Sequence, residues 1–269
     1  SLPAEESKLL TLVGERTPVI TPNIYLLVYD AYVPNETMLA YGIDNSVQED
    51  YLSEQGFKLY PHTYSIGSST VETMSKVLNA STEYYGDMRR GVSGDGITQI
   101  LLRDIGYETY GLFPYDFMFR GSVGESYDYS IPESSIPPYV QLLKAIFLGE
   151  FRFDIEDVGF REQTRLQFVE TKQSIFEDVS GNRVFIYMHS NLPSHSQNSG
   201  ACRPDETDRF EKRLRRANSE MRKDVNLIIE NDPGAIVIVA GDHGPYLTKN
   251  CYITTGVYNT SEISRLDIQ

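Results

Sequence analysis

Three short apolar runs constrain the fold of this chain more than any other feature. They lie at residues 24–29, 184–188 and 235–240 and consist mainly of aliphatic and aromatic side chains. Runs of this length without polar alternation suit strands that are buried on both faces of a parallel sheet. A further strand is expected at 107–113, and helices are expected at 47–55, 71–78, 97–105, 161–176 and 205–230. Strands that alternate with helices predict an α/β fold, with a mostly parallel central sheet and helices on both faces.

The length and composition fit one globular domain. The chain has 269 residues, 40% of them hydrophobic, which is enough to form one large core. Residues 1–22 are interpreted as a polar lead-in and 23–269 as the domain, within which 114–160 is a Tyr-, Pro-, Ser- and Gly-rich insertion with a helix at 139–148. We expect this insertion to carry specificity.

No apolar stretch approaches the roughly 20 residues that cross a bilayer. The chain begins with Ser-Leu-Pro and shows no signal segment. We therefore expect a processed protein, or the soluble part of a longer one.

The charge balance excludes one class of partner. The formal net charge is −14, and an acidic surface repels phosphate backbones, so we expect no nucleic-acid binding. A small phosphate ester remains compatible with this charge, because a bound cation reverses the local field.

The ends of the three apolar runs carry the candidate chemistry. The first run leads to Asp30, the second to His189, and the third to Gly241 followed by Asp242 and His243. Because parallel strands end at the same edge of a sheet, these side chains are expected to meet there. Two carboxylates and two imidazoles at one edge predict a site for a divalent cation. Taken singly, an Asp after a strand is as consistent with a turn or a helix cap.

Thr70 is the candidate nucleophile. It follows Gly67-Ser68-Ser69 at the expected start of a helix, where free backbone N–H groups and the helix dipole favour anions. A hydroxyl in this position is able to attack phosphorus once a metal ion helps to remove its proton. The alternative is an ordinary N-cap threonine.

A second histidine, His195, follows His189 within the segment His-Ser-Asn-Leu-Pro-Ser-His. Two of the chain's four histidines thus lie in one loop, which is as consistent with a functional role as with a structural one. Cys202 follows His195, and Cys251 follows the Asp242-His243 pair. If both loops flank one site, the two cysteines are expected to form a disulfide, which requires an oxidising compartment; two inert thiols are the alternative.

Three segments resemble sulfatase-like proteins of the alkaline-phosphatase superfamily. They are 22–30 (Pro-Asn-Ile leading to Asp30), 64–70 (ending on Thr70) and 240–245 (Ala-Gly-Asp-His-Gly-Pro), in the order that the family keeps. The resemblance implies that Asp30, Thr70, Asp242 and His243 surround one divalent cation, whose identity (Mn, Zn, Mg or Ca) the sequence leaves open. It also implies that His189 or His195 binds the substrate phosphate or protonates the leaving group. It is greatest for lipoteichoic acid synthases and for phosphoglycerol and phosphoethanolamine transferases, which use a Thr. Residues 70–74 lack the Cys/Ser-x-Pro-x-Arg run of arylsulfatases.

The resemblance also implies a function. We expect an extracytoplasmic, metal-dependent phosphoryl-group transferase or phosphodiester hydrolase of the cell envelope, whose membrane anchor lies outside these residues. Its donor would be a phosphate ester or phospholipid, and its acceptor a sugar or lipid hydroxyl. The alternatives are a phosphatase or sulfatase-type hydrolase, or a degenerate domain that binds without catalysis. Relatives continue into another strand and helix, so a truncated C-terminus is also expected, with a further ligand or substrate wall beyond Gln269.

Overall fold

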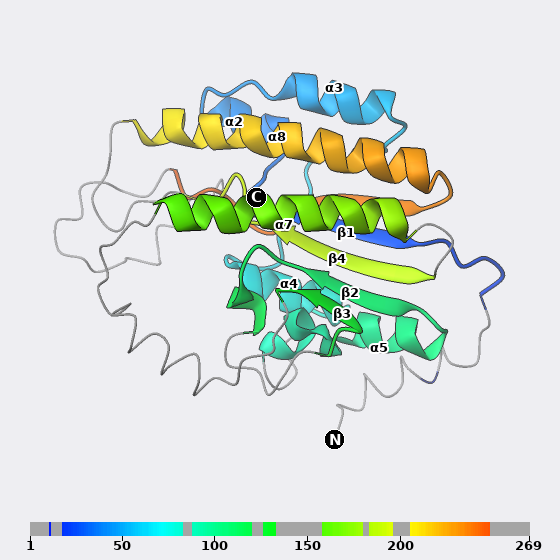
Figure 1. Cartoon of the computed structure of the whole chain (residues 1–269). Coiled ribbons are helices and arrows are strands. Elements are labelled where there is room, and N and C mark those ends of the chain that lie inside the picture. Colours follow the sequence, from blue (N-terminus) through cyan, green and yellow to red (C-terminus); the bar gives the residue numbers. More distant parts are fainter. Residues whose placement is uncertain are drawn as a thin grey trace, which may run out of the picture.

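The computed structural model describes residues 11, 18–82, 88–119, 126–132, 158–179, 183–195 and 205–247. These residues form a five-stranded, all-parallel sheet with helices on both faces, which confirms the predicted α/β fold (Figure 1). The strand order is β3-β2-β4-β1-β5. The strands are β1 (Ile24–Tyr29), β2 (Glu108–Leu112), β3 (Tyr129–Ile131), β4 (Val184–Ser190) and β5 (Ile236–Gly241).

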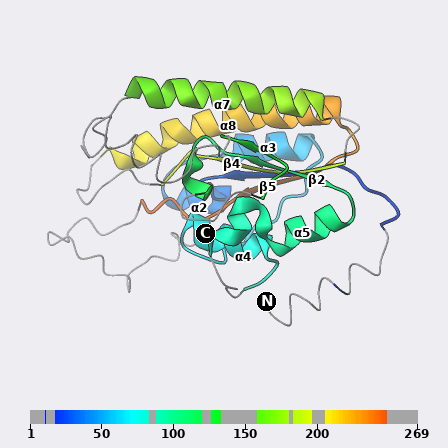
Figure 2. The same ribbon diagram turned by 60° about the horizontal axis from the view of Figure 1, so that its bottom comes forward.

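Helices cover the two faces of the sheet as separate layers. Helices α7 and α8 lie over one face and α4 and α5 over the other, as Figure 1 and the turned view in Figure 2 both show. Two shorter helices, α2 and α3, lie beside α8. The helices are α2 (Asn35–Ala40), α3 (Ser46–Glu54), α4 (Thr70–Leu78), α5 (Ile97–Asp104), α7 (Val158–Asp178) and α8 (Glu206–Asn231), with short helical segments η1 (Gly91–Asp95) and η2 (Asp116–Phe119).

Strand β1 contributes side chains to the hydrophobic core on both faces of the sheet. Its residues Tyr25 and Leu27 pack in a cluster with side chains of α7 and α8, whereas Leu26 and Val28 pack with side chains of α4. All five residues from Tyr25 to Tyr29 are buried, as expected for an apolar run inside a parallel sheet. This burial fixes the position of the residue that follows, Asp30.

The most apolar strand departs from the prediction. The run at 235–240 was expected to be buried on both faces, but β5 lies at the edge of the described sheet, and Ile236 and Ile238 are each 47% exposed. In the described sheet β5 pairs with β1 on one side only, and the buried side chains of α4 pack against β1 and β4. Apolarity predicted the strand correctly but not its place in the sheet.

Several sequence predictions lie outside the described residues. They are the helix at 139–148, most of the insertion at 114–160, and the Cys202–Cys251 disulfide. Within the described part of the chain, no helix combines the length and the apolarity needed to cross a membrane.

Candidate metal centre and substrate cavity

Asp30, Asp242 and His243 meet where β1 and β5 end. Tyr29 pairs with Gly241 in the last rung of these parallel strands, so the next residue of each strand, Asp30 and Asp242, lies at the same level. Each of the three side chains offers one ligand atom, and these atoms lie within 4.8 Å of one another. Nε2 of His243 is 3.4 Å from Oδ1 of Asp30 and 3.5 Å from Oδ2 of Asp242. The predicted convergence of strand ends is therefore present in the structure.

The two oxygens of Asp242 have different surroundings. Oδ1 accepts the backbone N–H groups of Ala31 and His243, each at 2.9 Å. These two bonds fix the carboxylate, so that Oδ2 remains directed at Asp30 and His243. The preceding residue must be glycine, because a Cβ on Gly241 would lie 1.8 Å from the carbonyl oxygen of Tyr32.

The tautomer of His243 follows from its partner. Its Nδ1 lies 2.8 Å from the carbonyl oxygen of Gly244. A carbonyl oxygen only accepts, so Nδ1 carries a proton, and in the neutral ring Nε2 therefore presents a lone pair towards the two carboxylates. A metal-ligating histidine is held in the same way, with one nitrogen donating to a carbonyl and the other free for the ion. Tyr246 stacks on this ring at a centroid distance of 5.2 Å.

This group fits one divalent cation. Oδ1 of Asp30 and Oδ2 of Asp242 are buried and lack a hydrogen-bond partner among the described residues. Burial, and next the charge of Asp242, raise the pKa of Asp30 to about 7. Two orphaned carboxylate oxygens facing an imidazole lone pair are unfavourable unless a positive charge lies between them. Asp30, Asp242 and His243 are thus able to hold a metal ion through two oxygens and one nitrogen, a donor set that suits several divalent metals.

Thr70 lies beside the carboxylate and imidazole group. It is the first residue of α4, and the N-cap position belongs to Ser69, whose backbone is extended (φ −143°, ψ 156°). The alternative that Thr70 is the N-cap is therefore wrong. Its Oγ1 lies 3.4 Å from Nε2 of His243. The hydroxyl is thus placed at the anion-favouring end of a helix, next to the atoms that would bind a cation.

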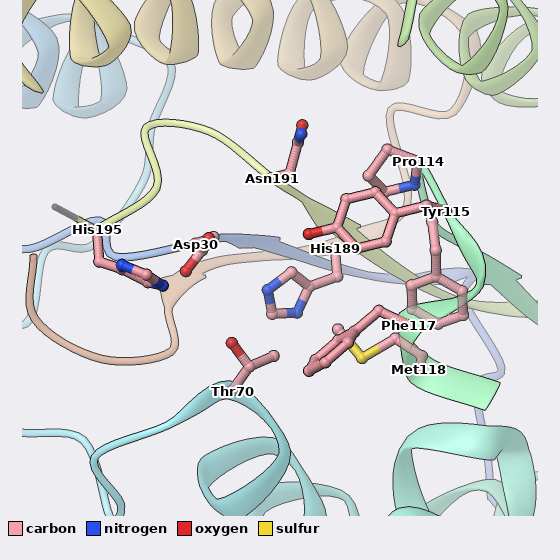
Figure 3. A pocket seen from close by; sticks show the side chains of 10 residues that line it. Asp30, Thr70, Pro114, Tyr115, Phe117, Met118, His189, Asn191 and His195 are labelled. Atoms are coloured by element: carbon pink, nitrogen blue, oxygen red, sulfur yellow. The ribbon is translucent and has the colours of Figure 1, made fainter. Parts of the chain in front are cut away.

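Both candidate histidines border a cavity of about 200 Å³ in front of this group. Figure 3 shows the side chains of Asp30, Thr70 and His189 converging there, with His195 beyond Asp30. His189 is part of β4 and lies almost fully buried, with Nε2 3.5 Å from Oδ2 of Asp242. The ring of His195 is 5.9 Å from that of His243. The structure thus brings together all six predicted catalytic and metal residues.

The loop that carries His195 is anchored by a residue that sequence reasoning did not assign to the site. Arg213 of α8 donates from Nε to the carbonyl of Pro193 at 2.7 Å and from Nη2 to the carbonyl of His195 at 3.3 Å. Ser194 N–H donates to the carbonyl of Asp30 at 2.9 Å. In the sequence Arg213 belongs to a run of basic residues on a long helix and does not stand out.

Another wall of the cavity comes mainly from the start of the insertion at 114–160, which is expected from the sequence to carry specificity. The chain leaves β2 and enters η2 through apolar side chains that line it, namely Phe113, Pro114, Tyr115, Phe117 and Met118 (Figure 3). The sequence placed a specificity role in this insertion as a whole but did not single out these side chains. Their position directly after the carboxyl end of a parallel strand is consistent with a role in the site.

No protein-family model matches this chain, and no curated protein matches it. The chemistry of the site is therefore inferred from its own side chains.

Proposed function

We propose that this chain is a metal-dependent phosphoryl-group transferase or phosphodiester hydrolase with Thr70 as nucleophile, similar to the Thr-dependent sulfatase-like enzymes of the alkaline-phosphatase superfamily. One observation carries the proposal. A threonine hydroxyl at a helix N-terminus lies 3.4 Å from the imidazole of a buried Asp30–Asp242–His243 group whose carboxylate oxygens lack partners among the described residues.

The reaction has two steps on Thr70. A cation held by Asp30, Asp242 and His243 would act as a Lewis acid, withdrawing charge from the hydroxyl and from the phosphoryl oxygens. Oγ1 of Thr70 loses its proton to water and attacks phosphorus, while the bond from phosphorus to the leaving alcohol breaks. An acceptor hydroxyl, or water, then attacks the phosphothreonine and regenerates the Thr70 hydroxyl.

The two histidines differ in what they can offer the substrate. Burial lowers the pKa of His189 to about 4, so this ring is neutral at physiological pH and suits binding of the phosphoryl group. His195 is partly exposed and lines the same cavity, so it suits proton delivery to the leaving alcohol.

The charge balance of the cavity favours a phosphodiester. Two carboxylates and one divalent cation sum to zero, and the residues that line the described cavity include no Arg or Lys. A phosphodiester brings one negative charge, whereas a phosphomonoester carries about −1.5 to −2 at neutral pH. The apolar wall at 113–118 further favours a donor with an organic substituent, of phosphate-ester or phospholipid type. The acceptor is a sugar or lipid hydroxyl, or water, outside the cytoplasm.

The test uses bis(p-nitrophenyl) phosphate as a generic donor with Mn²⁺ or Zn²⁺. We expect turnover by the wild type, and an acid-quenched protein whose intact mass shows one phosphoryl adduct on Thr70. Thr70→Val removes the hydroxyl without changing the shape of the side chain, and should lower kcat by at least about 1,000-fold. Thr73→Val is the matched control, since Thr73 lies in the same helix and its hydroxyl has no hydrogen-bond partner among the described residues. Full activity in Thr70→Val would refute the nucleophile.

A further inference from the structure

Tyr187 is a buried tyrosine whose hydroxyl contacts the ring of His189. The two residues lie two positions apart in β4, so both side chains project to the same face of the sheet. The phenol oxygen lies 2.9 Å from Nδ1 of His189, and Tyr187 has no exposed surface. The phenol ring packs in an apolar cluster, with the ring of Phe113 at a centroid distance of 5.3 Å.

The direction of this hydrogen bond follows from the available acceptors. Among the described residues, Nδ1 of His189 is the partner of the Tyr187 hydroxyl. Burial raises the pKa of Tyr187 well above its usual value, so the phenol keeps its proton. If Nδ1 carried the ring proton, the buried phenol proton would have no acceptor among the described residues, which is unfavourable. The phenol therefore donates, Nδ1 accepts, and Nε2 carries the proton of the neutral ring.

His189 and His243 thus adopt opposite tautomers. His243 donates from Nδ1 to the carbonyl of Gly244 and presents a lone pair at Nε2. His189 accepts at Nδ1 and presents an N–H at Nε2, which faces Oδ2 of Asp242 at 3.5 Å beside the cavity. A lone pair suits a metal ligand, whereas an N–H suits a donor to an anionic oxygen.

We propose that Tyr187 is a positioning residue that fixes His189 as an Nε2–H donor to a non-bridging phosphoryl oxygen, which leaves proton delivery to the leaving alcohol to His195. The inference rests on the proposed function and deepens it. His189 transfers no proton in either step: its Nε2–H strengthens as a hydrogen bond while charge develops on the phosphoryl oxygens.

The first test reads the tautomer directly. The chain contains only four histidines, so ¹⁵N-histidine labelling gives a spectrum with four rings, and His189→Gln identifies the signals of His189. Long-range ¹H–¹⁵N correlation near neutral pH should place the proton of His189 on Nε2. In Tyr187→Phe part of the population should move to Nδ1–H. A wild-type ring with its proton on Nδ1 overturns the inference, and this spectrum decides the matter even if the variant folds poorly.

The second test is kinetic, with the same donor and metal. Tyr187→Phe should lower kcat on the order of 10-fold, with KM and bound metal unchanged, since losing an outer partner of a site histidine has effects of this size. Tyr127→Phe is the matched control: it lies in the same apolar cluster, and its hydroxyl donates at 2.9 Å to the backbone carbonyl of Val92, which does not line the cavity. Equal kcat in the two variants would contradict a positioning role.

Failure of this inference and failure of the proposed function give different results. A wild-type enzyme that turns over with its His189 proton on Nδ1 refutes only the role of Tyr187. A wild type that binds no metal and does not turn over refutes the proposed function, and with it the catalytic role of His189, whatever the spectrum shows.

Discussion

At the scale of single residues, the candidate site depends on a glycine whose missing side chain leaves space for a neighbouring loop. This glycine is Gly241, and the carbonyl group of Tyr32 occupies the space that a side chain at this position would need. The same loop supplies the Ala31 N–H that binds Asp242. Any atom added at Gly241 must push this loop away and thereby release Asp242, a carboxylate of the candidate metal site.

Gly241→Ala tests this requirement. A Cβ at 1.8 Å from a backbone oxygen forces a backbone shift, so we expect a loss of stability of about 1–3 kcal/mol, together with weaker metal binding. Gly234→Ala is the control, because a Cβ there meets no atom within 4 Å, and it should be neutral or stabilising by up to about 1 kcal/mol. Urea denaturation of both variants checks the result, and equal effects would contradict the steric argument.

Residue by residue, the sequence predicted the groups that follow apolar runs and missed those inside them. Asp30 and Asp242 each follow a β-prone run, and they could be recognised as a candidate site because His189 and His243 follow the ends of such runs as well. Tyr187 lies within such a run, where its phenol is indistinguishable from a core aromatic. Its function depends on which neighbour its hydroxyl meets, and that is decided by the tertiary structure.

At the scale of elements, α7 and α8 are joined to the sheet by a buried ionic cluster. Lys172 of α7 has no exposed surface and lies 2.9 Å from Glu220 and 2.6 Å from Asp224, both of α8. Asp224 also accepts the hydroxyl of Tyr29 in β1 at 2.9 Å. Arg165 pairs with Glu220 and donates to Asn191 at the cavity, so the cluster connects the helical layer to the end of β4.

Lys172→Met should be strongly destabilising. It removes the cation from between two buried carboxylates, and breaking a buried pair in this way costs about 3–5 kcal/mol. Arg215→Ala is the comparison: the Glu211–Arg215 pair of α8 is 2.7 Å long but solvent-exposed, so its loss should cost less than about 1 kcal/mol. Urea denaturation gives the free energy of unfolding of both variants. Similar losses of stability in Lys172→Met and Arg215→Ala would contradict a stabilising role of the cluster.

The elements that the sequence missed are short. Helix α2 has six residues and β3 has three, which is too short for apolar periodicity to appear. The predicted bounds of β1, α4, α5 and α8 agree with the structure to within one residue at each end. Longer elements were recognised because their patterns repeat over several turns or rungs.

At the scale of the whole molecule, the order of the strands in the sheet brings the residues of the candidate site together. Strand β1 lies between β4 and β5, which follow it by more than half of the chain, so residues far apart in sequence share one edge. The sequence predicted parallel strands and a shared edge, but not the order β3-β2-β4-β1-β5. That order depends on which faces pack together and is not encoded in any one segment.

Because Asp30 is buried at this edge of the sheet, the stability of the metal-free protein and its affinity for a cation are both expected to depend on pH. In the folded, metal-free protein Asp30 keeps its proton up to about pH 7, whereas an unfolded Asp is ionised above about pH 4. The folded state thus binds more protons between these values, so stability without metal falls as the pH rises through this window. A cation replaces that proton, and its binding is therefore favoured above about pH 7 and weakened below it.

The most direct test of the central claim is bound metal, measured by elemental analysis after loading with Mn²⁺, Zn²⁺ or Mg²⁺. We predict about one ion per chain at about pH 8, less at about pH 5.5, and none in Asp242→Asn. Asp44→Asn, an equivalent change at an exposed aspartate, should bind metal like the wild type. No ion in the wild type at the higher pH, or equal metal in wild type and Asp242→Asn, would contradict a catalytic metal centre at Asp30, Asp242 and His243.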